Sequence, residues 1–245
     1  MIPINLKDKN EFINNFLSPI SKLTENTVLK VAGDRIKAVS SSNDGTLIVS
    51  CNYMQDNEIE DSVNLNIPDI SKLTKVLTCI EDNDILLSFN NNNIEYSSKS
   101  VGFKYHLLED GIIEPPSVDI NKIKKIDFNF KFKIPYNIIS SLIKGSTFTT
   151  ETDKIYFHTT DEGVSATLTD QQRHNVDSYT QHITDKYSGN PLESALSLNF
   201  ETMRILSSIR FDELNVMINP ELNVFLFDIS VNNTKINIIS SGYVG

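Results

Sequence analysis

The sequence predicts an α+β fold of two similar domains, each with two strand–helix–meander units whose helices lie on one face of antiparallel sheets. Two observations support this prediction. A strand-like alternation of apolar and polar residues runs into a helix-like pattern four times along the 245-residue chain. The matching points of these segments, Leu6, Ile67, Ile134 and Phe200, are 61, 67 and 66 residues apart, which is the spacing of an internal repeat.

Each repeat begins with a strand and continues into an amphipathic helix. In the second helix, Ile70, Leu73, Leu77 and Ile80 recur every three or four residues and form one apolar stripe that must pack against a sheet. Pro19 lies within the first helix and predicts a bend or an early end there. The four strand–helix segments span residues 4–23, 65–80, 132–148 and 198–210.

Short β-rich runs follow each helix and are separated by turn residues. The turn signals include Gly33-Asp34, Asn43-Asp44-Gly45, Asp161-Glu162-Gly163 and Asn219-Pro220. We therefore expect a small antiparallel meander after each helix.

One stretch, residues 109–127, contains Pro115-Pro116 and shows no clear period. It predicts an extended connector between two halves that each hold two repeats. The alternative is an ordinary long loop within one domain. The predicted bounds are an N-terminal domain over 1–108, the connector over 109–127 and a C-terminal domain over 128–245.

The composition predicts an intracellular protein without a membrane span. Hydrophobic residues make up 39% of the chain, and no run of 18 apolar residues occurs. The first residues, MIPINLKDKNEF, contain no apolar signal core, so we do not expect export. Cys51 and Cys79 show no metal-type spacing, so we expect buried free thiols in a reducing compartment.

Charge is unevenly distributed between the predicted helices and the remaining chain. The chain has 32 acids against 22 lysines and arginines, a net charge of -10, which by itself argues against a partner rich in phosphate. The helix windows 7–23, 69–80, 136–150 and 201–211, however, hold eight bases and four acids. Their balance is therefore +4, and the remaining chain carries -14. All four acids lie in a first turn, where the helix dipole favours them. A basic helix layer rich in serine suits sequence-independent contact with a sugar-phosphate backbone, although ordinary solvated helix faces would have a similar composition.

The sequence contains no recognisable catalytic or cofactor motif. It has no GxGxxG, no GxxxxGK[ST] and no GxSxG, and its four histidines show no metal-ligand spacing. We therefore expect neither an enzyme nor a bound cofactor or metal ion.

Three long stretches of the sequence resemble the DNA polymerase sliding clamps, the group that contains proliferating cell nuclear antigen and the clamps of tailed phages. The resemblance rests on the apolar spacing and order of LNIPDISKLTKVLTCIEDNDILLSF, FKIPYNIISSLIKGSTFTTETDKIYFHTTDEGVSATL and LSLNFETMRILSSIRFDELNVMI, and it extends over essentially the whole chain. It implies two similar DNA-clamp domains per subunit and three subunits closing head to tail into a ring, with helices inside and sheets outside. It also implies that duplex DNA passes through the ring, that a DNA polymerase is tethered, and that an external ATP-dependent clamp loader opens the ring.

The resemblance also implies roles for individual residues. It implies that the DNA-facing residues are Lys7, Lys9, Lys22, Lys72, Lys75, Lys144, Arg204 and Arg210. It implies that subunits join through edge strands at 102–108 and 163–169, with the interface residues Phe103, Tyr105, Leu107, Ser165, Thr167 and Thr169. It implies a client pocket near the connector that includes Val39, Leu47, Ile112, Ile113, Pro220 and Tyr243.

Two other classes of function stay open on the sequence. One is a β-rich oligomeric scaffold or virion protein that does not bind DNA, and the other is a small-molecule enzyme whose residues are scattered along the chain. Residues 121–133 hold five lysines and one acid, where the resemblance implies a more acidic connector. The Asn- and Ile-rich usage and the short chain favour a phage or other virus, and hence the cytoplasm of a host cell.

Overall fold

The computed structural model describes residues 2–90, 92–150, 152–173 and 175–243, and the chain divides into two compact units. Unit 1 is built from the residues up to 42, from 49–118 and from 231–236. Unit 2 is built from 43–48, from 119–230 and from 237 onward. Each unit therefore includes a short segment from the other half of the sequence.

Unit 1 contains a four-stranded antiparallel sheet in which β6 is an edge strand. Its order is β1-β4-β5-β6, with Ile4 opposite Leu87 and Ile94 opposite Tyr105. These four residues are buried, so one face of the sheet supplies core. The strands are β1 (Ile2–Leu6), β4 (Ile85–Asn90), β5 (Asn93–Ser97) and β6 (Gly102–His106).

Strands β2 (Thr27–Ser41) and β3 (Leu47–Ile67) are neighbours in a second sheet. The run β2 reverses direction, because the hydroxyls of Thr27 and Ser40 are only 3.4 Å apart, whereas a straight strand of this length would separate them by about 40 Å. Gly33, at the middle of the run, has a φ of 57°, the left-handed conformation that tight hairpin turns require. The turn predicted at Gly33-Asp34 is therefore confirmed.

The first helical segment of unit 1 changes its hydrogen-bond pattern next to a proline. It runs through α1 (Lys9–Glu11), the π-helical η1 (Phe12–Leu17) and α2 (Ser18–Ser21). The Ser18 N–H bonds the Ile13 carbonyl, five residues back. Because Pro19 has no N–H to continue an α-helical ladder, a π-helical turn at this point relieves the missing bond. The helical segment therefore continues through Pro19, with a change from α-helical to π-helical hydrogen bonding just before it.

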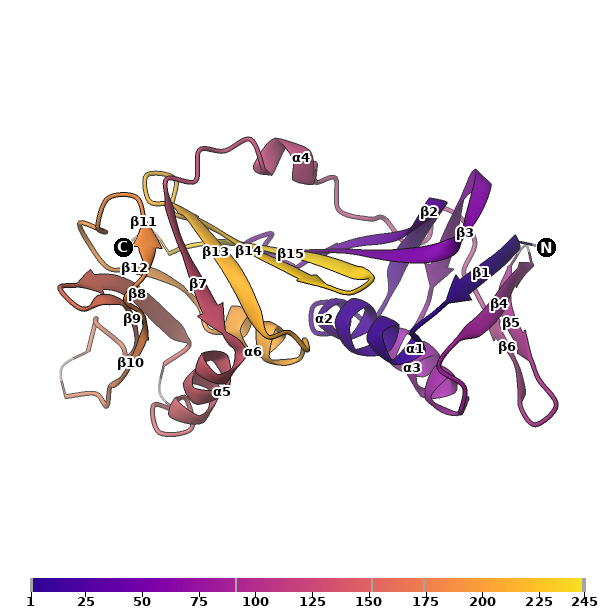
Figure 1. Ribbon diagram of the computed structural model, residues 1–245, viewed down its shortest axis with the longest axis horizontal. Helices are drawn as coiled ribbons and strands as arrows, with labels where there is room; N and C mark the ends of the chain where they lie inside the picture. Colours follow the sequence, from indigo (N-terminus) through magenta and orange to yellow (C-terminus); the bar gives the residue numbers. More distant parts are fainter. Residues whose placement is uncertain (1, 91, 151, 174, 244–245) are drawn as a thin grey trace. The chain divides into compact units, whose positions relative to one another are not determined.

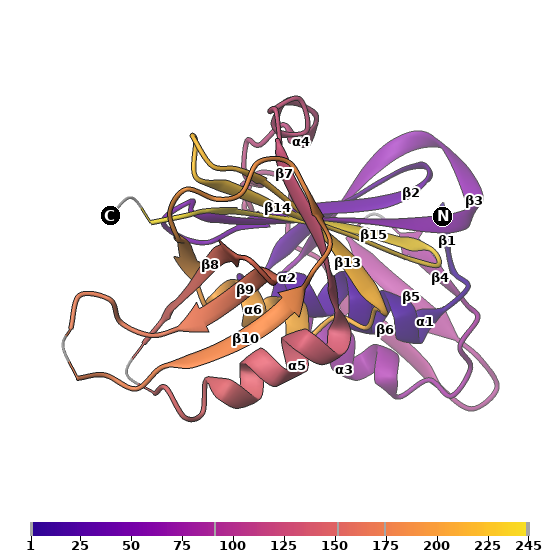
Figure 2. The same ribbon diagram turned by 60° about the vertical axis from the view of Figure 1, so that its left-hand side comes forward.

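The second helix of unit 1, α3 (Ile70–Thr78), packs against η1, as Figures 1 and 2 show. Asp69 caps it by accepting a hydrogen bond from the Lys72 N–H at 2.8 Å. The apolar stripe Ile70, Leu73, Leu77 and Ile80 is buried, as predicted.

Unit 2 repeats the arrangement of unit 1 in a sheet of order β12-β8-β9-β10. In both sheets, the strand that precedes a helix pairs with the first strand of a three-stranded meander, and the last strand of the meander lies at the opposite edge. The predicted strand–helix–meander repeat is thus confirmed in these two sheets. The strands are β12 (Leu196–Asn199), β8 (Lys154–Thr160), β9 (Gly163–Leu168) and β10 (Tyr179–Thr184).

Phenylalanines join this sheet to the other strands of unit 2. The Phe157 ring centre of β8 lies 6.0 Å from that of Phe132 and 5.7 Å from that of Phe225. Both belong to five consecutive strands of a larger sheet, in the order β11-β7-β13-β14-β15. Such contacts bury large apolar area on both inner faces. These five strands are β11 (Tyr187–Ser188), β7 (Phe130–Pro135), β13 (Glu213–Asn219), β14 (Val224–Val231) and β15 (Thr234–Ser241).

The two long helices of unit 2, α5 (Tyr136–Gly145) and α6 (Glu201–Ser207), pack side by side (Figures 1 and 2). The connector contributes a single helical turn, α4 (Ile120–Ile123). Within the described part of the chain, no helix is both long and apolar enough to cross a membrane. Cys51 is a buried free thiol, but the expectation for Cys79 is wrong, because it lies exposed at the end of α3.

Candidate functional site

The helices of unit 1 present three exposed lysines. Lys72 and Lys75 lie on the face of α3 opposite its buried stripe, and Lys22 follows α2 directly. Exposed acids occur just past this helix, in residues 81–84, so the cationic surface ends with α3. Three cations on packed helices can contact several neighbouring phosphates of a duplex.

The helices of unit 2 present a similar set: Lys144, Arg204 and Arg210 are all exposed. Arg204 donates to Glu201 at 3.0 Å and lies 5.6 Å from the centre of the Phe200 ring. Glu201 lies in the first turn of α6, three residues before Arg204, so the ion pair holds the guanidinium along the helix surface. The carboxylate also lowers the net positive charge of this helix. The unit 2 helices are therefore only weakly basic.

Two of the lysines assigned to DNA have other partners. Lys9 is buried, with 3% of its surface exposed, and its ammonium donates to the Ile80 carbonyl. A buried ammonium cannot reach a phosphate, so the assignment of Lys9 is corrected to a structural role that ties α1 to the end of α3. Lys7 is exposed but pairs with Asp56 at 2.6 Å.

The predicted edge at residues 102–108 corresponds to β6, which lies at the edge of its sheet. Phe103 is half-buried and stacks on Tyr96, with ring centres 6.0 Å apart. Tyr105 instead points into the core: its hydroxyl donates to the Asp69 carbonyl at 2.7 Å and accepts from the Asp69 N–H at 3.2 Å. Burial raises the pKa of Tyr105 to about 12. The side chain of Tyr105 is thus corrected from an interface residue to an anchor for the start of α3.

The second predicted edge, at 163–169, is wrong. It corresponds to β9, which lies between β8 and β10 and is paired along both sides. Ser165 is buried, Thr167 bonds Thr180 of β10 at 2.9 Å, and the Thr169 hydroxyl donates to the Asp177 carbonyl at 3.4 Å. A strand with both sides paired cannot accept another chain. The edges of this sheet are β10 and β12, and β10 is the edge next to β9.

A groove of about 840 Å³ lies in unit 1 between β2 and the start of the connector. Two of the predicted client residues, Val39 and Ile113, line it together. The connector is anchored here by the side-chain amide of Asn66, which donates to Asp110 at 2.8 Å and to the Leu108 carbonyl at 3.3 Å. We call this the connector groove; its other apolar lining residues are Val28, Ala38, Pro115 and Pro116, and its charged lining residues are Lys30, Lys37, Asp110 and Glu114.

The remaining predicted client residues lie elsewhere. Leu47 is a buried core residue, and Ile112 is 60% exposed beside the groove without lining it. Pro220 and Tyr243 belong to unit 2. The Tyr243 N–H donates to the Ser197 carbonyl at 3.0 Å, and its hydroxyl accepts from Asn199 at 3.1 Å.

Leu107, predicted at the subunit interface, follows β6 directly. Its N–H donates to the Asn92 carbonyl at 2.8 Å, which continues the pairing of this edge toward the connector. The leucine side chain is half-buried.

Sequence reasoning missed most of the connector groove and all of β10. Val28 and Val39 are half-exposed valines on the outward face of β2, where polar residues are expected. Apolar residues at these outward positions were the sequence signal for a groove. β10 carried no such signal, because its sequence, YTQHIT, is mostly polar. Within the described residues, no three His, Cys, Asp or Glu side chains are placed to hold a metal ion.

No protein-family model matches the sequence, and no curated protein matches it. Solved structures match along nearly all of the chain. Proliferating cellular nuclear antigen from Entamoeba histolytica aligns over 99% of this chain and 98% of its own, with a TM-score of 0.80 and 14% identity. A. fulgidus PCNA, in a structure with the C-terminal region of FEN-1 bound, aligns over 100% and 99%, with a TM-score of 0.77 and 12% identity. The PCNA2-PCNA3 complex from Sulfolobus tokodaii aligns over 98% and 99%, with a TM-score of 0.75 and 14% identity.

These matches define the class of fold. The strand–helix–meander repeats, the helices with exposed cations and the whole-chain alignments agree. The chain has the fold of a DNA polymerase sliding clamp of the PCNA type.

Proposed function

We propose that this protein is a DNA polymerase processivity factor, a ring-shaped sliding clamp that encircles duplex DNA and has no catalytic activity of its own. The observation that supports this most strongly is the whole-chain likeness of its fold to PCNA. In the proposed clamp, the domain bounds are 1–108 and 128–245, joined by the connector at 109–127. The DNA-facing residues are Lys7, Lys22, Lys72, Lys75, Lys144, Arg204 and Arg210.

Ring closure uses the two sheet edges. In the proposed homotrimer, β6 of one subunit pairs with β10 of the next, because each is the edge strand that ends the meander of its sheet. Phe103 and the residues around it pack at this contact. The structure of the PCNA2-PCNA3 complex from Sulfolobus tokodaii, in which two such proteins are associated, supports a self-assembling clamp.

Clients are proposed to bind in the connector groove through apolar anchors placed near Val39 and Ile113. The structure of A. fulgidus PCNA with the C-terminal region of FEN-1 supports binding of protein segments by this fold. The partners we propose are double-stranded DNA without sequence preference, a DNA polymerase and an ATP-dependent clamp loader. The proposed location is intracellular, in the host cytoplasm if the protein is viral.

Charge reversal on the helices tests this function. A quadruple variant combines Lys72→Glu, Lys75→Glu, Arg204→Glu and Arg210→Glu. It should no longer stimulate processive synthesis by the cognate polymerase, because the attraction to phosphate is lost. Its folding and self-association should stay intact. A charge-matched control reverses four exposed cations outside the helices, namely Arg35, Lys99, Arg173 and Lys235. Equal stimulation by the two variants would refute the assignment.

A scaffold that does not bind DNA is the second possibility. It predicts the same edge-to-edge association but no dependence on the helix cations. The charge-reversal pair therefore separates the two functions directly.

A further inference from the structure

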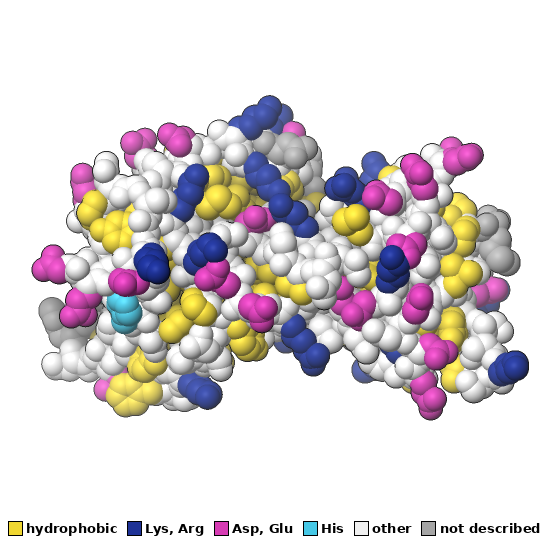
Figure 3. Space-filling model, in the orientation of Figure 1, with side chains coloured by type: hydrophobic (Ala, Val, Ile, Leu, Met, Phe, Trp, Pro, Cys, Tyr) yellow, Lys and Arg dark blue, Asp and Glu magenta, His cyan; other side chains and the backbone are white. Residues whose placement is uncertain are grey.

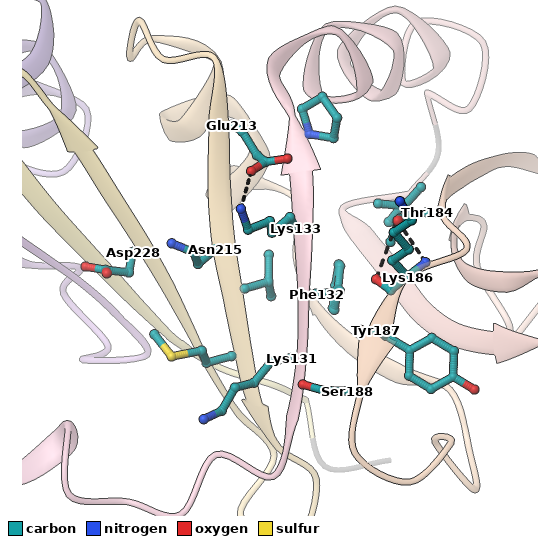
Figure 4. A pocket seen from close by; sticks show the side chains of 14 residues that line it. Lys131, Phe132, Lys133, Thr184, Lys186, Tyr187, Ser188, Glu213, Asn215 and Asp228 are labelled. Carbon is teal, nitrogen blue, oxygen red and sulfur yellow. Dashed lines mark hydrogen bonds and ion pairs between the residues drawn. The ribbon is translucent and has the colours of Figure 1, made fainter.

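The outward face of β7 forms the floor of a second groove, which lies wholly within unit 2. Phe130, Phe132 and Ile134 of this strand are buried, whereas Lys131 and Lys133 are exposed on the opposite face. With β13 and the segment 183–188, this face encloses a groove of about 470 Å³ (Figure 4). We call it the β7 groove.

Part of the β7 edge in this groove has no strand partner. β11 pairs with β7 only through Tyr187 opposite Phe132 and Ser188 opposite Lys131. Among the described strands, nothing pairs with residues 133–135 on that side. The chain from Lys186 back to Ile183 stays beside this part of β7, because these residues line the same groove as Lys133 and Pro135. A groove bounded in this way by two chain segments can hold an extended peptide.

The groove combines an apolar floor with cations. Pro135 and Met217 are partly exposed and supply apolar surface, whereas Ile183 and Val216 lie buried beneath it. Lys133 is already paired with Glu213 at 2.6 Å. Lys131 and Lys186 are exposed, and neither ammonium has an acidic partner among the described residues. Two cations are therefore available to a ligand.

Further lysines surround the groove. α4 packs on the same sheet through Ile120 and Ile123, which contact a cluster that also includes Met217 of the groove floor. Lys122, Lys124 and Lys125 are exposed on this segment. Figure 3 shows Lys and Arg side chains gathered at α4 and on the surface next to it. The sliding-clamp resemblance does not account for the lysines of residues 121–133. Together they contribute to a positive electrostatic potential around the β7 groove.

We propose that the β7 groove docks an extended, acidic segment of a partner protein. The segment lies in the groove beside β7, places one apolar side chain against Met217, and puts carboxylates at Lys131 and Lys186. A nucleic acid suits the groove less well, because Glu213 and Asp228 also line it and would repel a continuous phosphate backbone. The positive field around the groove would speed association with an acidic segment.

A peptide selection tests this proposal. A phage library of random dodecamers is panned on the wild-type protein, and the most enriched peptide is synthesised and titrated by fluorescence anisotropy. We expect enriched peptides to carry at least two acids flanking an apolar residue. The double variant Lys131→Glu/Lys186→Glu should bind the peptide at least about tenfold more weakly, since both charge contacts become repulsive. The control Arg35→Glu/Lys99→Glu has the same charge change in unit 1 and should bind within about twofold of wild type.

Three results would overturn the proposal: enrichment of peptides without acids, no enrichment, or equal binding by the double variant. A labelled twenty-nucleotide oligothymidylate is titrated in parallel. If it binds wild type more tightly than the peptide and loses binding in the double variant, the surface is a nucleic-acid site and the proposal fails. None of these measurements involves duplex DNA or ring closure, so their failure is distinguishable from failure of the proposed function.

Discussion

The ring of Tyr179 in β10 lies directly against the backbone of Gly145 at the end of α5: a Cβ added to Gly145 would lie 2.3 Å from Cδ1 of Tyr179 and 2.7 Å from its Cγ. This contact connects a helix that carries a proposed DNA-facing lysine, Lys144, to the proposed edge strand. The position of the edge thus depends on a glycine in the helix.

Substitution of Gly145 by Ala should therefore displace the Tyr179 ring and loosen β10. We expect a loss of about 1–3 kcal/mol in the free energy of unfolding and weaker self-association, measured by urea titration and by sedimentation. Gly102→Ala is the control for the unfolding measurement alone, since Gly102 lies on the proposed interface strand β6; its added Cβ would meet the nearest atom, the Tyr96 carbonyl oxygen, at an ordinary 3.5 Å. Equal effects of the two substitutions would show that the Gly145–Tyr179 contact is not special.

Two aromatic residues of β6 should separate stability from assembly. Tyr105→Phe removes both hydrogen bonds to the Asp69 backbone and should cost about 1–2 kcal/mol in unfolding free energy without changing self-association. Phe103→Ala should weaken self-association more than it weakens folding, because Phe103 is partly exposed on the edge strand. Analytical ultracentrifugation and urea titration of both variants measure the two quantities, and the reversed pattern would place Tyr105 at the interface after all.

Glu11 should make stability depend on pH. Its carboxylate accepts hydrogen bonds from the Asn233 N–H at 3.0 Å and the Thr234 hydroxyl at 2.6 Å, yet burial is the larger effect and raises the pKa of Glu11 above its ordinary value of 4.5. Since the folded state binds this proton more tightly than the unfolded state, Glu11 disfavours folding at pH values above its raised pKa. Its unfavourable contribution to the free energy of unfolding therefore shrinks as the pH falls toward 4.5.

The variant Glu11→Gln isolates this effect, because it lacks the titrating group. The unfolding free energy of wild type relative to Glu11→Gln should rise as the pH falls from 7 toward 4.5, by at most about 1.4 kcal/mol per pH unit. Denaturant titrations at several pH values measure the difference. A constant difference would mean that the carboxylate is not held with a raised pKa.

The connector groove should be needed for client binding. Val39→Asp combined with Ile113→Asp places two carboxylates in the apolar lining and should lower polymerase stimulation at least about tenfold. The control is Leu222→Asp, a leucine that is 60% exposed in unit 2 and does not line this groove. Stimulation that survives the double substitution would place the client elsewhere.

Much of the fold could be predicted because burial imposes periodicity on the sequence. The α3 stripe and the strands that lead into helices follow their apolar residues closely. The strand β10 could not be predicted in this way, because it is an edge strand whose only buried side chain is Ile183. A mostly solvated strand has no apolar alternation to detect.

The site was less predictable because charge in a sequence does not report burial. Lys7 precedes the first helix and Lys9 begins it, yet only Lys9 is buried. Its ammonium bonds the Ile80 carbonyl, more than 70 residues away in sequence. Asn66, which anchors the connector, likewise acts through partners over 40 residues distant. Such long-range partners follow from tertiary packing and leave no local pattern.

Topological retention on DNA tests the sliding-clamp account most directly. The protein is loaded by its clamp loader onto a nicked circular plasmid, which is then isolated by gel filtration in high salt before and after cutting with a restriction enzyme that acts once. We predict that the protein stays with the circle, as a species of three 27.6-kDa chains, and leaves when the circle is made linear. Equal retention on circular and linear DNA, or no retention on either, would contradict the account.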